Sequence, residues 1–247
     1  MPFTTSLLHA APVRWRPALL LLAASRGWRA PLVFWALGVP IVALAARDRA
    51  DLGMSVLLFV PPLSALALFG ALYPQARRPA VWTTLFARAG SGCADLWRAS
   101  AATTVLYALV TGSLGVATFL GLRAGMPLDA EDVARIVSFA IVWAVLCGLA
   151  AMVVTATVRR GAAGVLVLWL AMPAFLRMLP IAEPARRTLE AVAPPLEAAV
   201  RLHAAWAGQL PDLAPWFAWQ LLGFIAFAVT VLWHRVRRIA QAPDAVE

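Results

Sequence analysis

Six long runs without a charged residue constrain this chain more than any other feature. A helix needs roughly 20 apolar residues to cross a bilayer core about 30 Å thick. The runs reach or approach that length, and they are continuous rather than alternating, which argues against β-strands. They occupy residues 30–46, 52–76, 99–122, 136–158, 161–176 and 213–233. The sequence therefore predicts an all-α membrane protein with six transmembrane helices.

The overall composition agrees with a single membrane domain over residues 1–247. The chain is 62% hydrophobic and 13% charged, whereas soluble domains are typically about 45–50% apolar and about 25% charged. The net charge of +9 would suit a nucleic-acid partner, but the arginines form short clusters between the apolar runs. That distribution is typical of membrane proteins, so we expect membrane lipid and no nucleic acid as a partner.

Arginine placement predicts the orientation of the bundle. If both ends and the even-numbered loops face the cytoplasm, the inside segments hold 13 arginines and 3 acids, and the outside segments hold 8 arginines and 9 acids. Arginine bias sets membrane topology. We therefore expect a multi-pass protein of the inner (cytoplasmic) membrane with both termini in the cytoplasm.

Two segments lie outside the spans. Residues 1–29 predict a cytoplasmic interfacial helix anchored by Trp15 and Trp28. A cleaved signal peptide is the alternative, so retention of the first 25 residues stays open. Helices one to five are predicted within residues 30–179, and helix six with its cytoplasmic tail within residues 212–247. For the segment between them, 180–211, the sequence predicts an external re-entrant hairpin. Its two short helices, 184–193 and 195–207, meet at Pro194 and Pro195, and such backbone is tolerated at membrane depth only when protein covers it.

The predicted spans carry little chemistry. No acid or histidine lies near a span centre, so a proton relay lacks its usual groups. His9, His203 and His234 are too scattered for a metal site, although a ligand role for His203 or His234 stays open. Cys93 and Cys147 are not expected to form a disulfide. The hydroxyls and amides within the spans are expected to bond their own helix backbone: Ser55, Ser64, Thr103, Thr104, Ser113, Thr118, Ser138, Thr155 and Gln220.

Catalytic residues are also missing. The chain has no lysine, which excludes a Walker A lysine for ATP phosphates. Ser91, between Gly90 and Gly92, invites comparison with the nucleophile of intramembrane proteases. A turn in a cytoplasmic loop is the preferred interpretation, and reactivity of Ser91 would be needed to keep the hydrolase alternative. We expect no enzyme and no cofactor bound by this chain.

Four segments resemble the permease subunits of type-2 ABC exporters and together cover nearly the whole chain. They are the interfacial segment 21–31 followed by a span with Pro40, the cytoplasmic segment 82–100 ending Leu96-Trp-Arg-Ala-Ser100, the turn Arg159-Arg160-Gly161 followed by 166–173, and the external pair 189–206. Arg77 and Arg78 stand where the family usually has an acidic residue and a glycine.

The resemblance implies a permease energised by a separate ABC ATPase subunit, which would bind ATP and Mg. A second copy or a homologous permease would complete the assembly, and the resemblance leaves homodimer and heterodimer open. It implies an ATPase-coupling helix around 81–89 in the cytoplasmic loop, with contact residues Trp82, Leu85, Phe86, Arg88, Asp95 and Arg98. It also implies re-entrant hairpin residues Pro194, Pro195, His203 and Trp206.

A rival interpretation from a different class is a non-transporting membrane scaffold or accessory subunit of a membrane complex. It accounts equally well for the basic cytoplasmic side and the missing catalytic groups. The transported substrate of an exporter is not indicated, because Phe139, Trp143 and Trp169 could face either lipid or cargo.

Overall fold

The computed structural model describes residues 15–25, 29–76, 92–125, 127, 129–158, 160–192, 194–195 and 215–241. Over these residues the secondary structure is helical and contains no strand, as predicted. The helices are α2 (Arg16–Ser25), α3 (Arg29–Asp48), α4 (Ala50–Ala76), α6 (Gly92–Gly125), α7 (Ala130–Thr157), α8 (Ala162–Met178), α9 (Glu183–Val192) and α11 (Pro215–Gln241).

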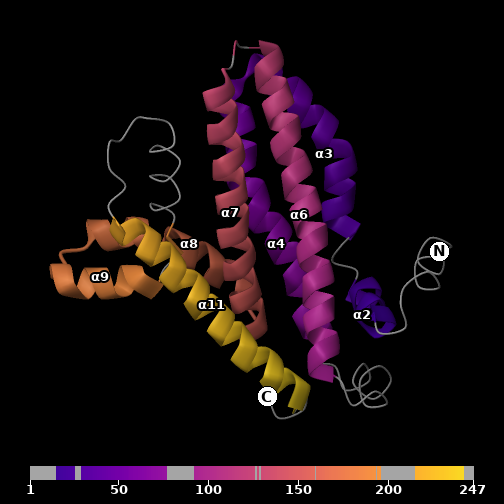
Figure 1. Cartoon of the computed structure of the whole chain (residues 1–247), viewed down its shortest axis with the longest axis vertical. Helices are drawn as coiled ribbons and strands as arrows, with labels where there is room; N and C mark the ends of the chain where they lie inside the picture. The colour runs from indigo at the N-terminus through magenta and orange to yellow at the C-terminus, as the bar shows by residue number, and fades with distance from the viewer. Residues whose placement is uncertain are drawn as a thin grey trace.

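Helices α3, α4, α6 and α7 run side by side as a bundle, and α8, α9 and α11 lie beyond α7 (Figure 1). The junctions between α3 and α4 and between α6 and α7 lie at one end, the upper end in Figure 1. Helix α2, the end of α4, the start of α6 and the end of α11 lie at the opposite end. We call these two regions the upper end and the lower end of the bundle.

Within the part of the chain that the structure describes, four helices are long and apolar enough to cross a membrane. Their spans are Val56–Pro74, Cys93–Ala124, Ala130–Thr157 and Trp219–Ile239. Helices α3 and α8 contain shorter apolar stretches, Trp35–Leu44 and Ala162–Met172. Each of the six predicted runs falls almost entirely within a helix, apart from the first residues of the last run. The long apolar helices fit a multi-pass membrane protein.

Several helices extend further than the uncharged runs. Helix α6 begins at Gly92, seven residues before the uncharged run at 99–122. Helix α7 begins at Ala130 because the Asp129 side chain caps it, accepting a hydrogen bond of 2.8 Å from the Asp132 backbone N–H. Helix α11 continues to Gln241 because its last turns still bury apolar side chains. Helix boundaries here are set by caps and packing as well as by charge.

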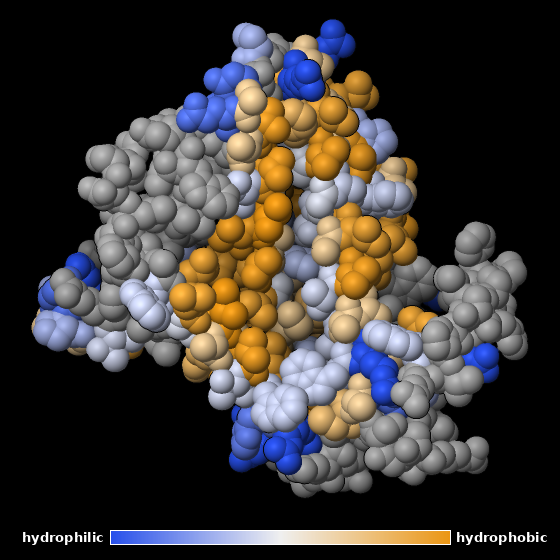
Figure 2. Space-filling model, in the orientation of Figure 1, coloured by the Kyte–Doolittle hydropathy of each residue, from blue (hydrophilic) through white to orange (hydrophobic). Residues whose placement is uncertain are grey.

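The main hydrophobic core joins helices from both parts of the molecule. It contains buried side chains from α2, α4, α6, α7, α8 and α11, while α3 packs on α4 and α6 through a second cluster of valines and leucines. Many large apolar side chains point outward, as Leu109 (64% exposed) and Leu63 (64% exposed) do. Figure 2 shows apolar ridges along the bundle and hydrophilic residues at its ends, an arrangement that suits a surrounding bilayer.

A proline pair in α4 is matched by a tryptophan in α7. Because Pro62 has no N–H, it cannot donate the helical hydrogen bond that the carbonyl of Leu58, four residues earlier, would otherwise accept. The indole N–H of Trp143 donates to that carbonyl at 2.9 Å. Trp143 is only 3% exposed and stacks on Phe139, with ring centroids 6.5 Å apart. The two side chains therefore face the protein interior, where α7 meets α4.

Most of the intramembrane hydroxyls bond their own helix, as the sequence predicts. Each of the following donates to a backbone carbonyl three or four residues earlier: Thr103, Thr104, Ser113, Thr118, Ser138 and Thr155. The prediction was wrong for Gln220. Its amide nitrogen donates to the backbone carbonyl of Glu190 at 3.2 Å and so connects α11 to α9.

Candidate functional site

A partly buried ion pair marks the start of α6 at the lower end of the bundle. The carboxylate of Asp95 is in the first turn of the helix, where the helix dipole stabilises a negative charge. It accepts a hydrogen bond of 2.5 Å from the guanidinium of Arg98. Asp95 is 1% exposed, and 30% of the Arg98 side chain remains accessible. The pair allows a carboxylate to be buried next to the core.

Two tryptophans connect this part of α6 to the end of α11. The rings of Trp97 and Trp233 lie 5.9 Å apart with their planes tilted by 31°, a separation typical of favourable aromatic pairs. The guanidinium of Arg237 lies 5.9 Å from the centre of the Trp233 ring, within reach of a cation–π interaction. The buried indole N–H of Trp97 has no hydrogen-bond partner within the described part of the chain.

Helix α2 packs into the same region. Its side chains Ala18 and Leu21 are fully buried and share the main core with Leu96 and Ala99 of α6. At the end of α4, the hydroxyl of Tyr73 lies 3.2 Å from the hydroxyl of Ser100. Four helices thus meet around the first turns of α6. We call this the α6 start site: α2, the end of α4, residues 95–100 and the end of α11.

The structure brings together only some of the residues predicted to contact an ATPase. Asp95 and Arg98 lie in the α6 start site, on a helix rather than in a loop. The other four, Trp82, Leu85, Phe86 and Arg88, fall outside the described residues. In the predicted hairpin, Pro194 and Pro195 are buried after α9, and His203 and Trp206 lie outside the described residues.

The sequence reasoning missed Trp97, Trp233 and Tyr107. Trp97 and Trp233 are tryptophans near predicted helix ends, a position typical of interfacial anchors, and that signal alone does not show that the two rings meet. Tyr107 is a buried tyrosine in the middle of α6, and its hydroxyl donates to the backbone carbonyl of Ala144 in α7 at 2.8 Å. A polar aromatic residue within a span was the available signal for a cross-helix contact.

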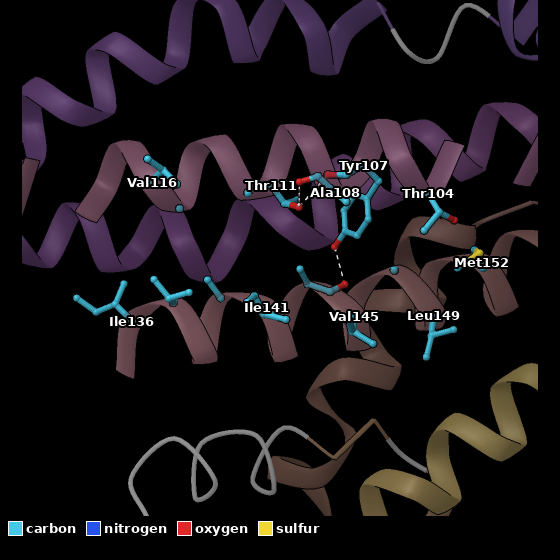
Figure 3. A pocket seen from close by; sticks show the side chains of 16 residues that line it. Thr104, Tyr107, Ala108, Thr111, Val116, Ile136, Ile141, Val145, Leu149 and Met152 are labelled. Carbon is cyan, nitrogen blue, oxygen red and sulfur yellow. Dashed lines mark hydrogen bonds between the residues drawn. The ribbon is translucent and has the colours of Figure 1, made fainter. Parts of the chain in front are cut away.

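Beside Tyr107 the surface is hollowed into an apolar groove of about 500 Å³ between α6 and α7 (Figure 3). Val116 and Ile136 lie at one end of the groove, and Thr104 and Met152 lie at the other. Small residues make up much of its lining, spaced four apart on each helix: Thr104, Ala108 and Gly112 on α6, and Ala140, Ala144 and Gly148 on α7.

Histidine, cysteine and acidic side chains do not gather in any group of three able to hold a metal ion within the described ranges. Cys147 is fully buried in α7. Phe139 and Trp143 lie in the interior, so neither lines a lipid-facing or solvent-filled surface. The α6 start site is a packed contact between four helices.

Comparison with known protein families, with curated proteins and with solved structures gave no match.

Proposed function

We propose that this chain is the membrane-spanning permease subunit of an ATP-driven exporter, energised by a separate ATPase subunit. The observation that carries the proposal is the α6 start site. A short helix, α2, is buried against the first turns of α6 and the end of α4, the two helices that flank the predicted coupling segment. Movement of that segment by a cytoplasmic partner would be transmitted into the bundle through this contact.

Charge supports the orientation that the proposal requires. Among the described residues, Arg16, Arg98, Arg160, Arg235, Arg237 and Arg238 lie at the lower end with the acid Asp95, and Arg29 begins α3 on the side of the bundle away from the upper end. Among the residues whose side chains the structure describes, the upper end combines Arg47, Arg49 and Arg123 with Asp129, Glu131 and Asp132. Basic residues accumulate on the cytoplasmic side of membrane proteins. Under the proposal, six helices span the inner membrane, and the lower end and both termini face the cytoplasm.

Helix α9 supports the proposed re-entrant hairpin. Figure 1 places it alongside the bundle rather than beyond the upper end. Its Arg186 pairs with Glu183 and also lies 3.7 Å from Glu190, so these charges are compensated within the helix. The Gln220 bond then holds α9 to α11. Protein contacts of this kind are what make charged, non-spanning segments tolerable at membrane depth.

The first experiment tests whether the chain binds a separate ATPase subunit. The chain is co-expressed with the ABC ATPase encoded nearest to it, and each is used to pull down the other. The proposal predicts a detergent-stable complex whose ATPase activity changes when the permease is present. If no such ATPase is encoded nearby and none co-purifies, the scaffold interpretation replaces the exporter.

A second experiment tests the coupling segment and the orientation. Replacing Phe86 by aspartate or Arg88 by glutamate should abolish transport in reconstituted vesicles while leaving assembly of the complex intact. Arg47 is an exposed arginine at the upper end of α3. Arg47→Glu is therefore the matched charge-reversal control and should leave transport unchanged.

A tag inserted at Arg49, between α3 and α4, should be accessible only from outside. Cytoplasmic accessibility of that tag would refute the orientation.

A further inference from the structure

The last turns of α11 have one buried side and one exposed side. Leu232, Val236 and Ile239 are each at most 3% exposed and belong to the main core. Because an α-helix has 3.6 residues per turn, the side of the helix opposite these three is formed by neighbours that are all exposed: Trp233, His234, Arg237 and Arg238. We call these four residues the α11 end patch. It lies at the lower end of the bundle, where Figure 2 shows hydrophilic residues.

The exposed side of α11 is apolar before it becomes cationic. Trp219, Leu222 and Val229 are between 50 and 69% exposed, as expected of a helix that faces hydrocarbon. The change to positive charge occurs within about one turn after Trp233. Tryptophan is enriched at the membrane–water interface. Trp233 therefore marks the depth at which α11 leaves the hydrocarbon core.

The two exposed arginines of the patch lie at the depth of lipid headgroups. Arg237 and Arg238 follow Trp233 by four and five residues, which is about 6 and 8 Å along the helix axis. The polar layer on each side of the hydrocarbon core is about 5–8 Å thick. Figure 1 shows α11 running obliquely to α7, and any tilt of α11 in the membrane shortens the distance from the core. The two guanidinium groups therefore lie among the lipid phosphates.

An aromatic contact positions one of these guanidinium groups. The guanidinium of Arg237 lies 5.9 Å from the centre of the Trp233 ring, and that ring packs on Trp97 of α6 with centroids 5.9 Å apart. An arginine that stacks on an aromatic ring keeps the N–H groups at its edge, in a geometry that matches the oxygens of a phosphate. Helix packing thus holds a phosphate donor at the exposed surface.

Within the described part of the chain, no carboxylate pairs with Arg237 or Arg238. Asp95, the acid at this end, pairs with Arg98. Arg235 lies half-buried at the edge of the patch and adds a third positive charge to the end of α11. The only acids that follow α11 in the sequence are residues 244 and 247, which lie outside the described residues. Three arginines exceed these two acids in charge wherever the acids lie.

These observations favour a ligand that is both anionic and apolar. We propose that the α11 end patch binds the phosphate of an anionic phospholipid, whose acyl chains lie against the apolar side of α11. A soluble anion would use the arginines alone, whereas a lipid also uses the apolar surface that continues from the patch. This inference depends on the membrane location of the bundle and not on the exporter proposal, so either can fail without the other.

Lipid titration followed by native mass spectrometry tests the proposal on the full-length protein. The purified chain in detergent is titrated with phosphatidylglycerol or with phosphatidylcholine carrying the same acyl chains, and the dissociation constant of the first bound lipid is measured. An arginine beside an anionic membrane surface favours binding about fivefold, the equivalent of about 1 kcal/mol. The double variant Arg237→Gln/Arg238→Gln should therefore weaken phosphatidylglycerol binding by about 25-fold. Phosphatidylcholine binding should stay unchanged, which also reports that the variant is folded.

Two sets of variants provide the controls. Arg47→Gln/Arg123→Gln removes the same charge from exposed positions at the upper end and should leave phosphatidylglycerol binding within twofold of wild type. Trp233→Leu should weaken phosphatidylglycerol binding by about threefold because Arg237 loses its aromatic contact. Trp233→Phe keeps a ring at that position and should restore most of the loss.

Four outcomes would overturn the proposal. Equal losses in the two double variants would mean that lipid responds only to net charge. Displacement of phosphatidylglycerol by inorganic phosphate would assign the patch to a soluble anion. A rise of more than tenfold in phosphatidylglycerol affinity in Asp244→Asn/Glu247→Gln would show that the tail occupies the patch. Loss of a co-purifying protein from Arg237→Gln/Arg238→Gln, with phosphatidylglycerol binding unchanged, would assign the patch to a protein partner.

Discussion

Replacing Trp143 by phenylalanine tests whether an indole compensates for a proline in a neighbouring helix. The substitution retains an aromatic ring against Phe139 and removes the N–H that donates to the Leu58 carbonyl at 2.9 Å. That carbonyl has no helical donor because Pro62 occupies the position four residues later. A buried polar group left unsatisfied costs about 1–3 kcal/mol. We expect Trp143→Phe to destabilise the bundle by at least that much, since the smaller ring also leaves space.

A double-mutant cycle separates the two effects. Pro62→Ala restores a backbone N–H that can bond the Leu58 carbonyl within α4. In that background Trp143→Phe should cost less, and the difference of about 1–2 kcal/mol isolates the hydrogen-bond contribution because the packing loss is common to both backgrounds. Reversible unfolding in mixed detergent micelles, followed by circular dichroism, measures the free energies. Equal costs of Trp143→Phe in the two backgrounds would refute the compensation argument.

Two further predictions concern packing and charge. Gly148→Ala would place a Cβ atom 2.9 Å from the ring of Tyr107. Overpacking and a disturbed hydrogen bond should outweigh the gain in helix propensity, so the substitution should lower the free energy of unfolding by about 0.5–3.5 kcal/mol. In the control Gly112→Ala the added Cβ meets nothing within 4 Å, so this variant should show no loss of stability in the same unfolding assay. Arg98→Ala removes the cation beside a carboxylate that is 1% exposed and should destabilise by about 1 kcal/mol, discounted for the exposed part of Arg98. Adding Asp95→Asn should recover stability, and a larger loss in that double variant would contradict the assigned pair.

The positions of the helices could be predicted from sequence because crossing a bilayer imposes a minimum apolar length. Helix starts could not be predicted as well. Asp95 and Arg98 suggested a solvated loop before α6, yet they pair with each other, which lets Leu96 and Ala99 be fully buried one turn into the helix. A charge in a sequence marks the edge of an apolar run, and only tertiary contacts decide whether the helix ends there.

The contacts of the candidate site were less predictable for a different physical reason. Pro62 identifies an unpaired carbonyl at Leu58 from sequence alone, but the donor is 85 residues away, and periodicity within α7 does not reveal which neighbour Trp143 meets. The same holds for Trp97 and Trp233, which meet only because α6 and α11 cross at the lower end. Long-range pairs depend on how helices are arranged, and the arrangement is not encoded in the hydrophobic length of any one of them.

The connected core has a mechanical consequence for the proposed exporter. Leu21 of α2, Leu72 of α4, Leu96 of α6 and Ile239 of α11 are each at most 1% exposed and belong to one cluster. Close-packed interiors transmit displacement because their side chains have few voids in which to relax. A partner that moves α2 or the segment before α6 must therefore shift several helices together. Coupling under the proposal would then be a concerted change between two arrangements of the bundle. The ATPase partner would act on the bundle at the α6 start site.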